Sequence, residues 1–384
     1  MKKISRIISM ALIFILVFSC VNFSFALEVK EPTLEINAKS AVLMDANTGT
    51  VLYSLNKDES LPPASVTKIM TLLLVFESID NGKLSYSDML TVSEYASSMG
   101  GSQVYLEPGE TMSVDDLLKS VIIASANDAA LTLAEHIYES EELFVSKMNE
   151  RANELGMKNT RFENVTGLDD DTKNHVTSAY DIALMSRELI KHKKVSEYAT
   201  IWMDTIRDGE FGLSNTNRLV RFYKGITGLK TGSTSKAGFC VSATAKRENL
   251  ELIAVIMGAE SSEIRNNCAT KLLDYGFANY SVFSSKGGIV ENIPILCGEK
   301  DLFNARYNEF QALETKNKKE LTSEITINEN ISAPVSENDV IGKIEYFLDG
   351  EKIAEENIYS CESVDRISYF GYLLKIFKKF LLIN

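Results

Sequence analysis

Ser65 and Lys68, a serine and a lysine three residues apart, are the pair whose types and spacing can do chemistry. Residues three apart lie on one face of a helix, so the hydroxyl and the amine can meet. A neutral amine there can take the hydroxyl proton, which would make Ser65 a nucleophile and Lys68 its base. The apolar run over residues 69–76 predicts a buried helix, and burial lowers the pKa of an amine toward neutrality.

The spacing alone does not identify the nucleophile. Ser-x-x-Lys also occurs from Ser54 to Lys57 and from Ser233 to Lys236. Context separates the three matches. Two prolines just before Ser65 favour an extended entry into the helix, and only this match is followed by a buried helix.

Two further polar clusters can complete a site. Ser125 and Asn127 lie between two predicted helices, a usual position for groups that point into a site, although both types are also ordinary helix caps. Lys230, Thr231 and Gly232 form the only Lys-Thr-Gly triplet in the chain, and we expect them to open a strand. Glycine lets a ligand approach the backbone, while the cation and the hydroxyl can bind a carboxylate.

The elements around these clusters predict an α+β fold, with an antiparallel sheet flanked by helices and a separate helical lobe. Strand patterns cover residues 41–45, 50–53, 239–245 and 250–257. The first two form a hairpin with its turn at residues 47–49. Helical patterns cover residues 113–124, 128–138, 141–155, 178–192 and 262–280.

The N-terminus has the pattern of a signal peptide, residues 1–26, which predicts export. A basic start precedes an apolar segment, and Ser24 and Ala26 are the small residues that a signal peptidase reads. We expect cleavage after Ala26. The alternative is lipidation at Cys20, but Phe18 is bulky for such a site.

Composition excludes several classes of function. The net charge of −13 argues against a nucleic-acid partner, and no basic stripe appears before the last twenty residues. The chain has five cysteines, one of them in the signal peptide, and no C-x-x-C spacing that would favour zinc. The other four cysteines could include a disulfide bridge between Cys297 and Cys361, but we expect them to be buried free thiols.

Taken in order, the three clusters resemble the signatures of the penicillin-binding proteins and serine β-lactamases. Within that superfamily the chain is most similar to the low-molecular-mass serine-type D-alanyl-D-alanine carboxypeptidases. The similarity covers roughly residues 35–280 closely. It is carried by Ala64-Ser65-Val66-Thr67-Lys68, Ser125-Ala126-Asn127-Asp128, Asn164-Val165-Thr166-Gly167-Leu168, Gly228-Leu229-Lys230-Thr231-Gly232 and Leu273-Asp274-Tyr275-Gly276-Phe277.

The resemblance implies a mechanism. Ser65 would attack the carbonyl between the two D-alanines of a peptidoglycan stem peptide, and neutral Lys68 would take its proton. Ser125 would relay a proton to the leaving amine, and Asn127 would bind the peptide and help to place Lys68. Water would then release the acyl-enzyme. No metal or cofactor is required, and β-lactam antibiotics would acylate the same serine.

The resemblance also assigns substrate-binding groups. Lys230 and Thr231 of the Lys-Thr-Gly triplet would anchor the terminal carboxylate beside Gly232. The backbone N–H groups of Ser65 and Ser233 would hold the oxyanion. A positive Lys230 nearby would also lower the pKa of Lys68.

Two alternatives share these signatures. A class A β-lactamase needs Glu-x-x-Leu-Asn after the second cluster, and Glu163 lies near that place but is followed by a different sequence. A non-catalytic penicillin-binding scaffold would keep the fold without the reaction. A Ser-His-Asp triad is a poor rival, since the three histidines are scattered and His175 is interpreted as a structural hydrogen-bonding residue.

After the signal peptide, the sequence predicts three segments. They are a catalytic domain over residues 27–280, a small β-rich domain over residues 281–365 and an amphipathic helix over residues 366–384. In that helix Phe370, Leu374 and Phe377 share an apolar face with Ile367 and Leu381, opposite Lys375 and Lys379. This pattern favours a helix in a membrane interface, at the outer face of the cytoplasmic membrane. A helix docked on the protein itself is the alternative.

Overall fold

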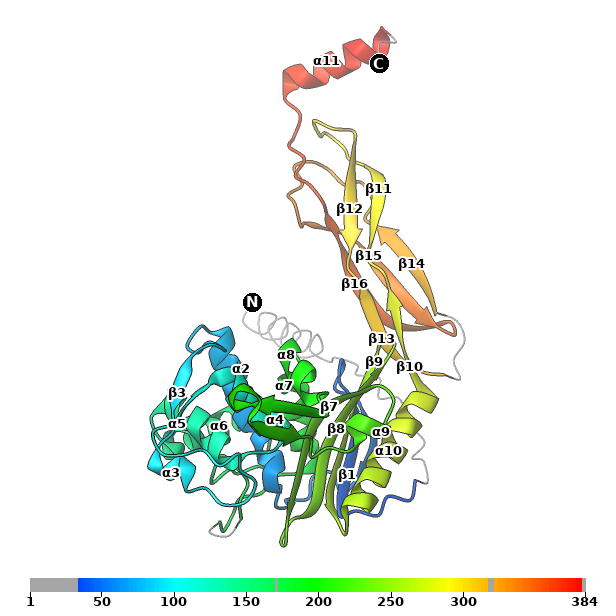
Figure 1. Cartoon of the computed structure of the whole chain (residues 1–384). Helices are drawn as coiled ribbons and strands as arrows, with labels where there is room; N and C mark the ends of the chain where they lie inside the picture. Colours follow the sequence, from blue (N-terminus) through cyan, green and yellow to red (C-terminus); the bar gives the residue numbers. More distant parts are fainter. Residues whose placement is uncertain (1–33, 170–171, 317–320, 382–384) are drawn as a thin grey trace, which may run out of the picture. The chain divides into compact units, whose positions relative to one another are not determined.

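The computed structural model describes residues 34–169, 172–316 and 321–381, so the predicted signal peptide lies outside the described residues (Figure 1). Within these ranges the chain forms an α+β part followed by a β-rich part and a final helix. The predicted fold class is confirmed.

The α+β part contains a five-stranded antiparallel sheet with strand order β2-β1-β9-β8-β7. Its strands are β1 (Ser40–Asp45), β2 (Val51–Leu55), β7 (Ile226–Thr234), β8 (Gly238–Arg247) and β9 (Leu250–Ala259). The predicted hairpin is confirmed, because β1 and β2 pair antiparallel across the expected turn. Since β1 also pairs with β9, the first hairpin and the late strands share one sheet.

Two helices cover this sheet, α7 (Ala179–Leu189) and α10 (Ser262–Asn279). In α7, Ser186 hydrogen-bonds Ser242, which lies opposite Val255 in the sheet. In α10, Gly276 lies against Leu252. Side chains alternate along a strand, so Val255 and Leu252 face opposite ways. The two helices therefore pack on opposite faces of the sheet.

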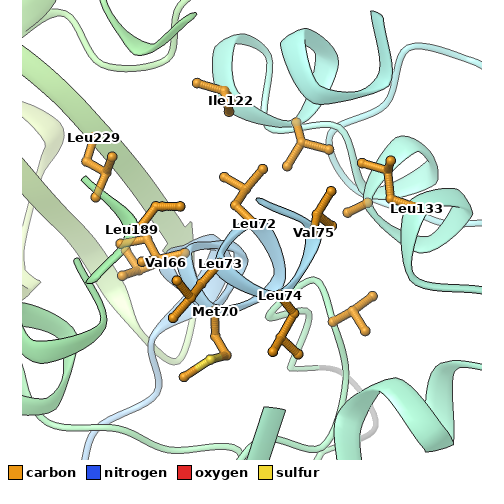
Figure 2. Packing of buried hydrophobic residues seen from close by; sticks show 14 of the residues in the cluster. Val66, Met70, Leu72, Leu73, Leu74, Val75, Ile122, Leu133, Leu189 and Leu229 are labelled. Carbon is orange, nitrogen blue, oxygen red and sulfur yellow. The ribbon is translucent and has the colours of Figure 1, made fainter. Parts of the chain in front are cut away.

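Helix α2 (Lys68–Asp80) lies at the centre of the helical lobe, and every residue from Lys68 to Phe76 is buried. Figure 2 shows Met70 and Leu74 on one side of this helix and Leu72 and Val75 on another, so the core surrounds it. The predicted buried helix is confirmed. Helices α5 (Asn127–Tyr138), α6 (Glu141–Glu154) and α7 and the turn η1 (Ala64–Thr67) pack against it, and the lobe also contains α3 (Glu94–Ser97), α4 (Val114–Ile123) and α8 (Lys193–Ala199).

The α+β part also contains the short elements β3 (Met89–Thr91), β4 (Thr111–Ser113), β5 (Met203–Ile206), η2 (Arg207–Gly209), β6 (Phe211–Ser214) and α9 (Leu219–Phe222), the last of which contacts β7. One predicted boundary is wrong, because α7 ends at Leu189 and not at residue 192. His192 instead precedes α8, with its Nδ1 2.8 Å from Asp80 and its ring stacked on Phe76. His192 is thus held against α2 at the point where α7 has ended and α8 begins.

The β-rich part contains a five-stranded sheet with order β11-β12-β16-β15-β14 and a separate β10-β13 pair. Its strands are β10 (Tyr280–Ser285), β11 (Gly288–Pro294), β12 (Leu302–Tyr307), β13 (Phe310–Thr315), β14 (Leu321–Ile327), β15 (Val340–Leu348) and β16 (Glu351–Ser360). It has its own core, centred on Phe303, Ile344 and Tyr346. Helix α11 (Tyr369–Phe380) follows it. No helix among the described residues is long and apolar enough to cross a membrane.

Candidate active site

Ser65 lies in the 3-10 turn η1, and Lys68 is the first residue of α2. The Lys68 Nζ atom donates to Ser65 Oγ at 2.9 Å and to the backbone carbonyl of Thr166 at 2.9 Å. The turn and the first residue of the helix thus place the hydroxyl and the amine in direct contact. Thr166 lies in one of the segments that carry the family resemblance but had no predicted role, and its carbonyl orients the amine from the other side.

Lys68 is completely buried. Burial lowers the pKa of its amine well below the ordinary value, the positive charge of Lys230 lowers it further, and the Asp128 carboxylate partly opposes both effects. A lowered pKa favours the neutral amine, which is the form that can accept a proton from Ser65.

Ser125 and Asn127 come from the junction of α4 and α5, and Ser125 has a left-handed backbone with φ of 64°. The Lys230 Nζ atom donates to Ser125 Oγ at 2.8 Å. The Asn127 side chain donates from Nδ2 to the Gly100 carbonyl at 2.6 Å. Its Oδ1 atom is buried and has no hydrogen-bond partner among the described residues, so it does not contact Lys68 there. That oxygen can accept a bond from a ligand.

The Lys-Thr-Gly triplet lies in the middle of β7, which begins at Ile226, so the prediction that it opens a strand is wrong. Pairing with β8 extends the strand on both sides of the triplet. The Lys230 Nζ atom also donates to the Thr231 carbonyl at 3.0 Å, and the Thr231 hydroxyl donates to Thr216 at 2.8 Å. Burial lowers the pKa of Lys230 to about 7, and the positive charge of Arg265 contributes to the shift.

Gly232 brings β7 against the turn that carries Ser65. A Cβ atom at this position would lie 2.7 Å from the Ser65 nitrogen and 2.9 Å from the Val66 nitrogen. Only glycine therefore lets the strand approach the Ser65 N–H group this closely. Ser233, the next residue, is exposed beside it.

A cavity of about 520 Å³ opens at this place. The predicted site residues in its lining are Ser65, Ser125, Thr231, Gly232 and Ser233. The other three, Lys68, Asn127 and Lys230, are buried next to it. All eight predicted site residues thus lie in or directly behind one cavity.

The cavity also contains residues that no motif marked, above all Arg265 from the first turn of α10. Its side chain is only 5% exposed, and its Nε and Nη2 atoms donate to Asn266 at 3.0 and 2.9 Å. Burial lowers the pKa of Arg265 to about 10, and Arg218 adds to the shift. The guanidinium still carries a charge at neutral pH. The sequence predicted the helix but held no local signal that this arginine faces the site.

His175 is a structural residue, as the sequence predicted. The Glu163 N–H donates to its Nδ1 at 3.0 Å, so the proton is on Nε2, which lies 2.8 Å from the Thr67 hydroxyl. Burial lowers the pKa of His175 to about 4, which keeps the ring neutral. It braces the turn next to Ser65 and does not line the cavity beside that serine.

The expectation of buried thiols is only half right. Cys240 and Cys268 are buried, whereas Cys297 is exposed and Cys361 is half-buried, and all four are free. The first two lie on elements of the packed α+β part, while the other two lie in the connections of the small β-rich part, where less chain covers them. The described residues contain no cluster of histidine, cysteine and carboxylate side chains that could hold a metal ion.

Comparison with known proteins matches both parts of the chain. A family model described as D-alanyl-D-alanine carboxypeptidase matches residues 26–261, and a model of the C-terminal domain of penicillin-binding protein 5 matches residues 280–366. The D-alanyl-D-alanine carboxypeptidase DacF of Bacillus subtilis is 40% identical over 378 residues, which cover 96% of this chain and 97% of that protein.

Solved structures agree with this assignment. Penicillin-binding protein 5 from Haemophilus influenzae matches with a TM-score of 0.72 at 33% identity, over 87% of this chain and 99% of that one. Penicillin-binding protein D2 from Listeria monocytogenes, in its ampicillin-bound form, matches with a TM-score of 0.59 at 35% identity, over 64% of this chain and 100% of that one. The chain therefore belongs to the family of serine-type D-alanyl-D-alanine carboxypeptidases, the penicillin-binding enzymes that act on the stem peptides of peptidoglycan.

Proposed function

We propose that Ser65 is the nucleophile of this carboxypeptidase and that neutral Lys68 is its base. The contact between the Lys68 amine and the Ser65 hydroxyl, at 2.9 Å, carries this assignment. Ser65 attacks the carbonyl carbon between the two D-alanines, its proton passes to Lys68, and an acyl-enzyme forms as D-alanine leaves. Water then hydrolyses the ester and restores Ser65.

Ser125 relays to the leaving amine the proton that Lys68 took from Ser65, which returns Lys68 to the neutral form. Ser125 suits this role because it lines the same cavity as Ser65 and is hydrogen-bonded to the Lys230 amine. In this arrangement Lys230 supports Ser125 and does not itself reach the cavity lining. The unpartnered Oδ1 atom of Asn127 accepts an N–H group of the peptide. These roles complete proton transfer without a metal or cofactor.

The oxyanion is held by the backbone N–H groups of Ser65 and Ser233. The close approach of Gly232 to the Ser65 nitrogen supports this assignment, since it brings β7 beside one of the two donors. The terminal carboxylate binds Thr231 and Arg265, which both line the cavity, and the sequence had paired Thr231 with Lys230. A guanidinium is well suited to a carboxylate because it can donate two parallel hydrogen bonds.

The remaining segments place this chemistry at the cell surface. In this proposal the catalytic domain covers residues 27–280, a β-rich spacer residues 281–365, and a membrane anchor residues 366–384, in which α11 (Tyr369–Phe380) lies in the membrane interface. The exposed apolar side chains of α11 support the last assignment, including Phe370, Leu374 and Phe377. With export by residues 1–26, the enzyme works at the outer face of the cytoplasmic membrane and in the cell wall.

The test is release of D-alanine from a pentapeptide that ends in D-Ala-D-Ala, measured for the natural chain and for Ser65→Ala. The natural chain should release D-alanine and gain a long-lived penicillin adduct on Ser65 by mass spectrometry, and the variant should do neither. Equal release by both proteins would overturn the assignment of Ser65. Rapid penicillin turnover would indicate a β-lactamase, and the absence of any adduct a non-catalytic scaffold.

A further inference from the structure

One Ser-x-x-Lys match, from Ser233 to Lys236, is not the proposed pair of nucleophile and base. It covers the end of β7 and the turn into β8. In this turn the N–H group of Ala237 donates to the Thr234 hydroxyl at 3.0 Å. The same hydroxyl donates to the Asp169 carboxylate at 2.5 Å, and the Lys236 amine donates to the backbone carbonyl of Asp169. Two side chains of the turn thus bind one residue from a distant part of the chain.

Asp169 directly follows the loop whose Thr166 carbonyl accepts a hydrogen bond from Lys68. The Asn164 side chain closes this loop. Its Oδ1 atom accepts the N–H group of Gly167 at 2.7 Å, and its Nδ2 atom donates at 2.7 Å to the carbonyl of the residue that precedes Asp169. Asp169 itself is only 8% exposed. Because the loop is closed by its own hydrogen bonds, the position of Asp169 affects the position of the Thr166 carbonyl.

The other end of the contact lies next to the proposed oxyanion site. Ser233, whose N–H group is one of the proposed donors, directly precedes Thr234 in β7. Gly232, one residue earlier, lies against the Ser65 nitrogen. The hydrogen bond between Thr234 and Asp169 therefore joins the two segments that both contact η1. One of them orients the proposed base, and the other carries the oxyanion donor.

We propose that Asp169 is a positioning residue for this hydrolysis. Its two contacts hold the end of β7 to the loop that orients Lys68, so the base and the oxyanion donor keep their places around Ser65. The proposal rests on the proposed function, because it uses the same nucleophile, base and oxyanion site. Asp169 is not part of the cavity lining, so it acts through these two segments and not on the substrate. Loss of its contacts misplaces the reacting groups, which slows the chemical step.

Substrate binding depends on other contacts. Thr231, which lines the cavity, donates to Thr216 at 2.8 Å, and Arg265 donates to Asn266 at 3.0 Å. Neither of these hydrogen bonds involves Asp169. The terminal carboxylate should therefore bind as before when the Asp169 contacts are removed, so that kcat falls and KM does not change.

The experiment measures D-alanine release by the full chain from a pentapeptide that ends in D-Ala-D-Ala. Thr234→Val removes the hydroxyl and Asp169→Ala removes the carboxylate. Each should lower kcat on the order of tenfold, because the reacting groups are misplaced, and leave KM unchanged. Thr234→Ser keeps a hydroxyl and Asp169→Asn keeps an acceptor oxygen, so both should recover most of the rate. An acid–base role of Asp169 would instead require the carboxylate itself.

The double variant that combines Asp169→Ala with Thr234→Val tests whether the two residues act through one bond. Its kcat should be close to that of each single variant, because either change already breaks the bond. Thr227→Val is the matched control. Thr227 is half-buried on the same strand as Thr234, and its hydroxyl donates to Thr244 at 2.9 Å, away from the cavity lining. This variant should release D-alanine at the natural rate.

Three results would overturn the inference alone, in a natural chain that releases D-alanine and forms the penicillin adduct. They are a natural kcat in Thr234→Val, losses that multiply in the double variant, and a full loss of rate in Asp169→Asn. An equal loss in Thr227→Val would show a general effect on β7 and would also overturn it. A natural chain that neither releases D-alanine nor forms the adduct would instead overturn the proposed function.

Discussion

At the scale of single residues, the site depends on two buried lysines with different partners. Lys68 contacts Ser65 and Lys230 contacts Ser125, so each hydroxyl has its own amine. Burial disfavours the charged form of both amines, and the charge on Lys230 further disfavours a charge on Lys68. The Lys68 amine is thereby kept in the neutral form that the proposed base needs, while the Lys230 amine, with a pKa of about 7, is partly charged at neutral pH.

This coupling predicts a shift in the pH profile of Lys230→Gln. Removal of the positive charge makes protonation of Lys68 easier, so the pKa of Lys68 rises. In the proposed mechanism penicillin acylation needs neutral Lys68, so the acylation rate falls as the pH drops through the pKa of Lys68. The acid limb of the rate profile should therefore move to higher pH in Lys230→Gln, as measured by stopped-flow acylation.

Ser125→Ala is the control for this experiment, because it removes the hydroxyl but keeps the Lys230 charge. The acylation rate of Ser125→Ala should be lower, but the acid limb of its pH profile should lie at the same pH as in the natural chain. An unchanged acid limb in Lys230→Gln would show that Lys230 does not influence the pKa of Lys68.

At the scale of elements, the site is the junction of a strand, a turn and a loop. Strand β7 meets η1 at Gly232, and the loop that contains Thr166 and Gly167 meets η1 from another side. A Cβ atom at Gly167 would lie 1.9 Å from the Ala64 carbonyl oxygen, and this residue has φ of +82°. Both glycines let backbone approach the turn that presents Ser65. The two glycines thus help to fix the position of Ser65, the proposed nucleophile.

Gly232→Ala should therefore impair acylation. The new methyl group would crowd the Ser65 nitrogen at 2.7 Å and displace one proposed oxyanion donor. Loss of such a donor costs about 10²-fold in rate. The acylation rate constant for penicillin measures the effect. Gly212→Ala is the matched control, since a Cβ atom at Gly212 meets nothing within 4 Å, and it should acylate at the natural rate. Equal rates in the two variants would argue against the proposed oxyanion site.

At the scale of the whole molecule, the chain joins a catalytic part with its own core, a β-rich part with a second core, and α11. Phe370 is 77% exposed and Phe377 63% exposed on this helix, which leaves a large apolar face uncovered. Lys375 on the same helix donates to the Gly298 carbonyl at 3.1 Å and pairs with Asp301 at 2.7 Å. Lys375 on α11 therefore contacts the β-rich part, and the exposed apolar side of the helix is consistent with the proposed membrane interface.

Deletion of residues 366–384 should release the enzyme from membranes without loss of D-alanine release from the pentapeptide. The apolar face is removed, whereas the catalytic core and the cavity keep all of their residues. Sedimentation with lipid vesicles measures the first effect, and the pentapeptide assay the second. A truncated enzyme that still sediments with vesicles would contradict the role of α11.

The sequence by itself determined the parts of this protein whose signals are local. Neighbouring residues and their periodicity indicate the pairing of Ser65 with Lys68, the buried helix after them and the hairpin turn. The order of the three motifs is visible directly in the sequence. These signals were enough to predict the α+β fold, and the three motifs marked the eight predicted residues that lie in or directly behind the cavity, but not Arg265.

Only the tertiary structure decided the contacts between distant segments. The Thr166 carbonyl on Lys68, the buried Arg265 facing the cavity, and the pairing of Lys230 with Ser125 depend on helices and strands that meet across the fold. The position of the Lys-Thr-Gly triplet in mid-strand depends on β8 in the same way. A contact between distant segments leaves no periodic pattern in either of them. The pairing of the Lys230 amine with the Ser125 hydroxyl could therefore be found only in the folded structure.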